Sequence, residues 1–125
     1  MKEKERILCV DDEEDIRKTL KDILEDEGFE VKTAIDGKDC LNQLKKLKPN
    51  VILLDILMPG LTTKEILAGI KRIDSKIPVI ILTVVKLSEA TKKKLLDSNM
   101  ADFIEKPFDN NDLIKRIKKV IKWLL

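Results

Sequence analysis

Short apolar runs alternate five times with segments whose apolar residues recur at helical spacing, and this alternation restricts the fold more than any other feature. The five runs are Ile7–Val10, Glu30–Ala34, Val51–Leu54, Val79–Leu82 and Phe103–Glu105. Each is short enough to be a strand, and each is followed by a segment with the periodicity of a helix. The chain is therefore predicted to have an α/β fold of the (βα)5 type, with a parallel sheet, helices on both faces and right-handed crossovers.

The polarity of the runs predicts their places in the sheet. Val51–Leu54 is the most apolar and is predicted to be the central strand, whereas the more polar Glu30–Ala34 is predicted to lie nearer an edge. Residues that commonly begin or end helices separate the runs. They are Gly28, Asp36-Gly37, Pro49, Thr62 with Glu65, Ser88 and Asp109.

Composition favours one compact domain with an aliphatic core. Hydrophobic residues make up 43% of the chain but aromatic residues only 3%. A chain of 125 residues is a normal length for one domain, so we expect residues 1–125 to form a single domain with no second, output domain in this chain. The 25 Lys and Arg residues nearly balance the 23 Asp and Glu residues, which gives no reason to expect binding to nucleic acid or to an anionic membrane.

The residues that are rare or absent exclude several kinds of chemistry. The chain contains no His, so His-based zinc sites and His-dependent nucleophilic triads are excluded. Cys9 and Cys40 are predicted to be small buried hydrophobic residues in a reducing compartment, not a disulfide. The charged start lacks the apolar region of a signal peptide, and the longest apolar stretch, around Val79–Val85, is too short to cross a bilayer. We therefore expect a soluble cytoplasmic protein.

Four of the five predicted strands end next to a carboxylate, a hydroxyl or an amine. Asp11 and Asp12 follow the first strand, Asp55 the third, Thr83 the fourth and Lys106 the fifth. Taken singly, the acids could complement the dipole of the next helix, the threonine could be an ordinary strand residue and the lysine could be solvated. Ligands of open parallel sheets bind outside the carboxyl ends of the strands, so the joint placement favours one site.

The residue types at this site favour phosphoryl chemistry with a divalent cation. Three carboxylates placed close together repel one another unless a cation lies among them, and Mg²⁺ prefers carboxylates, water and phosphate oxygens. A hydroxyl and an ammonium group complete what is needed to hold the outer oxygens of a phosphoryl group. A carboxylate can itself be the nucleophile, and Asp55 is the candidate, with Asp11 and Asp12 left for the ion. Pro107 is a candidate for a cis peptide bond after Lys106.

Taken together, these residues closely resemble a response-regulator receiver domain, the phosphoacceptor module of two-component signalling. The resemblance covers nearly the whole chain. It rests on Ile7-Leu8-Cys9-Val10-Asp11-Asp12-Glu13, Ala34-Ile35-Asp36-Gly37, Asp55-Ile56-Leu57-Met58-Pro59-Gly60, Thr83, Phe103 and Lys106-Pro107-Phe108. It implies a flavodoxin-like fold with strand order 2-1-3-4-5, and a signalling module that is not an enzyme beyond its own phosphorylation and slow dephosphorylation.

The resemblance also implies a role for each site residue. Asp55 would take a phosphoryl group from a phosphohistidine of a sensor histidine kinase. Mg²⁺ would be held by Asp11, Asp12, Asp55 and the backbone carbonyl of Leu57. Lys106 would pair with Asp55 and then with its phosphate.

A switch of conformation is implied as well. Thr83 would move to hydrogen-bond the phosphate, and Phe103 would turn inward behind it. This shift would remodel the face made by the fourth helix, fifth strand and fifth helix, where a downstream output protein or domain docks. Whether phosphorylation also drives homodimerisation is left open.

Three departures from the family pattern stand close to the site. Val84 replaces a small residue after the switch threonine and is expected to narrow phosphoryl access. Leu57 and Val85 occupy positions that are often polar in members with fast turnover, so we expect a long phosphoryl lifetime. Thr62-Thr63-Lys64 is an unusual start for the third helix and suggests an unusual partner surface there.

Three other interpretations compete with this one. A pseudo-receiver that binds partners without phosphorylation is the main alternative, and Val84 is the feature in its favour. A phosphatase of the haloacid-dehalogenase type would place its nucleophile after the first strand, whereas Asp55 follows the third. It would also need a cap domain, so this interpretation is not favoured. The basic run Lys115–Lys122 alternates with apolar residues as a solvated amphipathic helix does, so direct binding to DNA is not expected.

Overall fold

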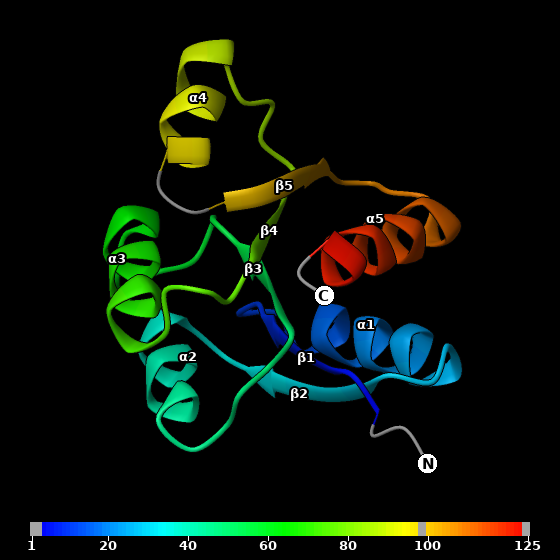
Figure 1. Cartoon of the computed structure of the whole chain (residues 1–125). Coiled ribbons are helices and arrows are strands. Elements are labelled where there is room, and N and C mark those ends of the chain that lie inside the picture. The colour runs from blue at the N-terminus through cyan, green and yellow to red at the C-terminus, as the bar shows by residue number, and fades with distance from the viewer. Residues whose placement is uncertain (1–3, 98–99, 124–125) are drawn as a thin grey trace.

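The computed structural model describes residues 4–97 and 100–123, and within them five strands alternate with five helices (Figure 1). The strands are β1 Arg6–Val10, β2 Glu30–Ala34, β3 Val51–Asp55, β4 Val79–Thr83 and β5 Met100–Glu105. The helices are α1 Glu14–Asp26, α2 Gly37–Leu44, α3 Thr63–Ile73, α4 Glu89–Asp97 and α5 Asn110–Trp123. The predicted (βα)5 alternation is confirmed.

All five strands are parallel, in the order β2-β1-β3-β4-β5. Figure 1 shows α1 and α5 on one face of this sheet and α2 and α3 on the other, with α4 beyond the β5 edge. The predicted strand order is therefore confirmed. Every residue of β3 and β4 is buried, whereas β2 mixes buried, half-buried and exposed residues, as predicted for a central and an edge strand.

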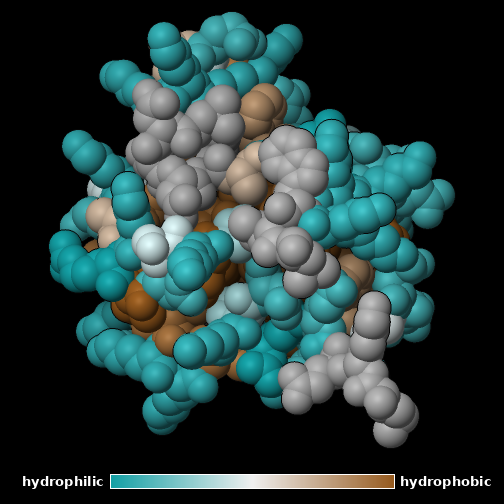
Figure 2. Space-filling view, viewed as in Figure 1, coloured by the Kyte–Doolittle hydropathy of each residue, from teal (hydrophilic) through white to brown (hydrophobic). Residues whose placement is uncertain are grey.

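Two aliphatic clusters form the core, one on each face of the sheet. Successive strand residues point to opposite faces, so Ile7 and Cys9 join the cluster under α1 and α5, while Leu8 and Val10 join the cluster under α2 and α3. Both cysteines are free thiols and are buried as predicted; burial is the main reason that the pKa of each is raised to about 12. Figure 2 shows a mainly hydrophilic surface with hydrophobic residues gathered toward the middle of this face.

Most of the predicted helix boundaries are confirmed by their capping hydrogen bonds. Thr62 and Glu65 form a reciprocal capping box at the start of α3. The Asp36 side chain accepts from the backbone N–H of Asp39, and the Ser88 hydroxyl accepts from that of Thr91. Gly28, just after α1, has a φ of 95°, in the left-handed region that favours glycine.

Two boundaries differ from the prediction by more than one residue. β5 begins at Met100, three residues before the apolar signal at Phe103. Asp102 interrupts that signal, but the Arg116 guanidinium of α5 lies 3.2 Å from its carboxylate and compensates the charge. α2 ends at Leu44, although Leu47 beyond it still packs against the core. Within the described residues, no helix is long and apolar enough to cross a membrane.

Candidate functional site

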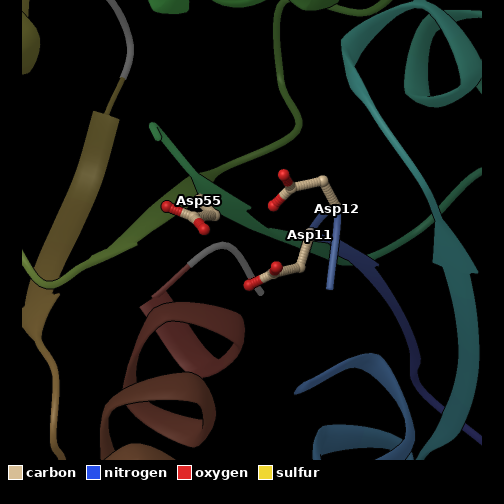
Figure 3. Close-up of side chains that lie close together, drawn as sticks. All are labelled: Asp11, Asp12 and Asp55. Carbon is tan, nitrogen blue, oxygen red and sulfur yellow. The ribbon is translucent and has the colours of Figure 1, made fainter. Parts of the chain in front are cut away.

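Three carboxylates meet at the carboxyl edge of the sheet. Strands β1 and β3 are neighbours, and their register pairs Val10 with Leu54, which brings Asp11 next to Asp55. Asp11, Asp12 and Asp55 can each present an oxygen so that these oxygens lie within 4.8 Å of one another. Figure 3 shows the three side chains around one shared space. The predicted convergence of the acids is confirmed.

The two adjacent acids differ sharply in their surroundings. Asp11 is 2% exposed, and both of its carboxylate oxygens accept hydrogen bonds, one from the Glu13 N–H at 2.9 Å and one from the Lys106 ammonium at 3.0 Å. Its backbone carbonyl accepts a third bond, at 2.9 Å, from the Arg17 guanidinium. Asp12 is exposed and has no hydrogen bond or ion pair within the described residues. The pair therefore offers one fixed carboxylate and one that water can reach.

Asp55 is a buried carboxylate at the end of the central strand. It is 6% exposed, and its Oδ1 accepts the backbone N–H of Leu57 at 2.9 Å. Burial raises its pKa; the Leu57 N–H and the Lys106 ammonium oppose that shift, and the nearby Asp11 adds to it. The protein's own groups thus leave the Asp55 charge incompletely compensated.

Lys106 links two of the acids across the sheet. Its Nζ lies 3.0 Å from Asp11 Oδ2 and 3.6 Å from Asp55 Oδ2. The predicted pairing with Asp55 is present, but the shorter contact is with Asp11. The Lys106–Pro107 peptide bond is cis, as the sequence suggested.

Thr83 ends β4 on the same edge and is fully buried. Its hydroxyl oxygen accepts the backbone N–H of Val85 at 3.0 Å, and its carbonyl accepts the backbone N–H of Lys106 at 2.7 Å. The second bond ties the loop after β4 to the loop after β5. The hydroxyl proton remains available for a ligand because the bond from the Val85 N–H uses only an oxygen lone pair.

The family model for the response regulator receiver domain matches residues 7–118, and those residues include every group described above. The chain belongs to the response regulator receiver family. It is 33% identical to the transcriptional regulatory protein PrrA of Mycobacterium leprae over 117 residues, which is 94% of this chain and 50% of that protein. It is 38% identical to the probable transcriptional regulator ycf27 of Guillardia theta over 95% of this chain and 46% of that protein. The receiver domain thus spans about half the length of these curated relatives.

Two solved structures similar to this receiver domain have nearly its own length. The chemotaxis protein CheY4 of Vibrio cholerae matches with a TM-score of 0.88 and 29% identity, covering 94% of this chain and 99% of that one. A CheY-like receiver domain protein of Methanospirillum hungatei matches with a TM-score of 0.91 and 29% identity, covering 98% and 97%. The predicted flavodoxin-like fold is confirmed by these matches together with the strand order.

The acidic group of this receiver domain fits a hard divalent cation. Three carboxylates face one ammonium group at the centre of the site, so an added cation would relieve the surplus negative charge. Asp12 is exposed and could exchange water for an ion, while Asp11 and Asp55 are fixed by their hydrogen bonds. The backbone carbonyl of Leu57 stays a predicted ligand.

Phe103 of the receiver domain, the second predicted switch residue, is half-buried on β5. It packs against the core cluster under α2 and α3, and the Lys92 ammonium of α4 lies 4.5 Å from its ring centroid. Phe103 therefore packs against the core and also contacts α4. Its switching role stays a prediction.

Two arginines with structural contacts near the site were missed by sequence reasoning. Arg17 bonds the carbonyl of Asp11, and Arg116 joins α5 to β5 through Asp102 and the carbonyl of Phe103. Both lie among other charged residues on amphipathic helices, where nothing in the spacing separates a bonded arginine from a solvated one. A three-dimensional contact was needed to find them.

Proposed function

We propose that this chain is the phosphoacceptor module of a two-component system, in which Asp55 accepts a phosphoryl group from a phosphohistidine of a sensor histidine kinase. The observation that carries the proposal is the setting of Asp55. It is a buried carboxylate with an ammonium group 3.6 Å away and two more carboxylates beside it. Such a group is a nucleophile whose product can be held by fixed positive charge.

The reaction forms one bond and breaks one. A carboxylate oxygen of Asp55 attacks phosphorus, and the P–N bond to the donor imidazole breaks, so the electron pair stays on the ring nitrogen. The product is an acyl phosphate on Asp55. Hydrolysis by water later returns the carboxylate and releases inorganic phosphate.

Three residues would assist this transfer. Lys106 would follow the developing charge from the Asp55 carboxylate to the phosphoryl oxygens, because its ammonium already lies between Asp11 and Asp55. The Thr83 hydroxyl would donate to the phosphoryl group, since it lies buried at the end of the neighbouring strand. Asp11, Asp12, Asp55 and the carbonyl of Leu57 would hold Mg²⁺. When bound, Mg²⁺ supplies charge neutralisation for the transferring phosphoryl group.

The output would follow from movement of Thr83 and Phe103. Phe103 contacts both the core and Lys92 of α4, so a rotation of the ring would alter the α4–β5–α5 face. We propose that residues 1–125 are a single receiver domain and that a separate output domain or protein reads this face. Relatives named DNA-binding response regulators are about twice as long as this chain, which supports an output of that general kind.

Intact mass spectrometry tests the proposal directly. The wild-type chain is incubated with Mg²⁺ and acetyl phosphate, beside an Asp55→Ala variant and a wild-type sample with EDTA. The expected result is one adduct of roughly 80 Da, present only with both Asp55 and Mg²⁺. If no adduct forms with acetyl phosphate or with a cognate kinase, the phosphoacceptor proposal fails and the pseudo-receiver interpretation replaces it.

A further inference from the structure

Arg17 occupies a position that is unfavourable for a cation on two grounds. It lies in the first turns of α1, where the helix dipole favours negative charge, and Glu14 and Asp15 follow that preference. It also brings a permanent positive charge close to Asp11, where a bound cation would be repelled. A specific contact must compensate for both costs.

That contact is the hydrogen bond from Arg17 Nη1 to the backbone carbonyl of Asp11, at 2.9 Å. The side chain of a helical residue leans toward the N-terminus of its helix, which lets Arg17 reach back over the preceding loop. Glu13, the residue before α1, makes no side-chain cap. The guanidinium bond therefore joins the loop to the helix, together with the bond from the Glu13 N–H to Asp11 Oδ1.

The bond fixes the peptide unit between the two acids. A peptide unit is planar, so holding the Asp11 oxygen sets the orientation of the whole plane and the direction in which the chain enters Asp12. The Asp11 N–H, which belongs to the preceding peptide unit, donates to the Ala34 carbonyl at 3.1 Å, so the backbone is held on both sides of the Asp11 Cα. The Asp12 side chain has no partner in the described part of the chain, so the direction in which its carboxylate points depends on how the backbone at Asp12 is held.

We infer that Arg17 is a positioning residue that aims the exposed Asp12 carboxylate at the cation held with Asp11 and Asp55. This inference rests on the proposed function. Arg17 contacts the backbone carbonyl of Asp11 and not a carboxylate of the site. It acts through the loop backbone, as residues that orient metal ligands do.

The opposing effects of charge and position make the inference testable. Loss of the Arg17 charge alone should tighten binding of a divalent cation, whereas loss of positioning should weaken it. We would measure the dissociation constant for Mn²⁺, a paramagnetic stand-in for Mg²⁺, from the EPR signal of the free ion. Arg17→Met is expected to weaken binding about 10-fold, as is typical when a residue that orients a metal ligand is lost.

Two variants serve as controls. Lys18→Met removes the same charge from the next residue of α1, whose side chain is exposed, and should leave the constant unchanged. Arg17→Lys keeps the charge and a hydrogen-bond donor, so its Mn²⁺ affinity should lie between those of Arg17→Met and the wild type. If Arg17→Met does not fold, Arg17→Lys is compared with the wild type in its place. The weakening should persist at high salt, because positioning is not screened as charge is.

Equal or tighter Mn²⁺ binding by Arg17→Met would overturn the inference while leaving the proposed function intact. If the wild-type chain holds Mn²⁺ no more tightly than an Asp12→Asn variant, the proposed metal site itself fails, and the inference with it.

Discussion

Asp55 carries its charge where that charge is poorly compensated, and this has a cost in stability. Its pKa is raised above the ordinary 3.8, mainly by burial. In the metal-free protein the folded state therefore holds the Asp55 proton more tightly than the unfolded state does. Stability is fully present below the ordinary pKa and is lost as the pH rises through the raised value.

Asp55→Asn is accordingly expected to stabilise the metal-free protein at neutral pH by about 1 kcal/mol, as is common when a functional residue that lowers stability is replaced. Asparagine keeps the oxygen that accepts the Leu57 N–H but has no charge to bury. Thermal unfolding in EDTA at several pH values measures the effect, which should disappear below pH 3.8. Asp22→Asn on the exposed side of α1 is the control, and an equal gain there would contradict the explanation.

Under the proposed function, two apolar residues at the rim of the site would affect how long a phosphoryl group stays on Asp55. Leu57 is 51% exposed and Val85 38% exposed, and each lies two residues after a site residue. Apolar groups there cannot orient a hydrolytic water. Leu57→Asn combined with Val85→Glu is expected to speed loss of phosphate about 10-fold, since a positioned polar group can assist proton transfer.

The decay of phosphorylated protein after removal of the donor measures that rate. Ile35→Asn is the matched control, because Ile35 is also exposed at the carboxyl edge but follows the edge strand β2. An unchanged or slower rate in the double variant would show that these positions do not set the lifetime.

Val84, expected to narrow phosphoryl access, is 65% exposed, so its side chain lies mostly in solvent.

At the scale of elements, α2 and α3 approach so closely that a Cβ added at either of two glycines would meet a side chain of the other helix. A Cβ built on Gly37 would lie 2.5 Å from Cδ1 and Cγ1 of Ile66. A Cβ on Gly69 would lie 2.8 Å from the two terminal methyl carbons of Leu41, which can rotate away. Neither glycine has a positive φ, so the need is for space alone.

Gly37→Ala is therefore expected to destabilise the protein by about 2 kcal/mol through overpacking. Gly69→Ala should cost less than about 1 kcal/mol, because Leu41 can move and alanine favours the helix. Urea denaturation measures both. Adding Ile66→Val, which removes the Cδ1 atom, should recover part of the Gly37→Ala loss; full additivity of the two changes would argue against the contact.

The sequence predicted strands and helices well where nearby residues determine their bounds. It predicted them less well where a contact with a residue distant in the sequence determines a bound. The buried runs of β1, β3 and β4 and the capping box of α3 were confirmed, since each depends on nearby residues. The start of β5 was misplaced because the charge of Asp102 is compensated by Arg116, which lies fourteen positions away. The convergence of the acids could be predicted because it follows from the order of the strands. The shorter contact of Lys106 with Asp11 could not, because it depends on how far the lysine side chain extends.

At the scale of the whole molecule, the acidic edge should couple cation binding to stability. A ligand that binds only the folded state stabilises it by about 2.7 kcal/mol at one hundred times its dissociation constant. Saturating Mg²⁺ is expected to raise the unfolding temperature by roughly 10 °C. Asp12→Asn should remove most of this rise without disturbing a hydrogen bond, because Asp12 makes none in the described residues.

Scanning calorimetry with Mg²⁺, and with NaCl at matched ionic strength, measures the difference. An equal rise in the Asp12→Asn variant would mean that the stabilisation comes from general screening and not from the acidic site.

The bond between Lys106 and Asp11 joins residues 95 positions apart, and it reaches from the end of the edge strand β5 to the end of β1. During synthesis, Asp11 and Asp55 emerge long before the lysine that completes their surroundings. A chain halted before β5 has the nucleophile but lacks Lys106 and the Thr83–Lys106 backbone bond. Under the proposed function, uptake of a phosphoryl group by Asp55 would need the Lys106 ammonium, so it would mark chains in which β5 has already joined the sheet.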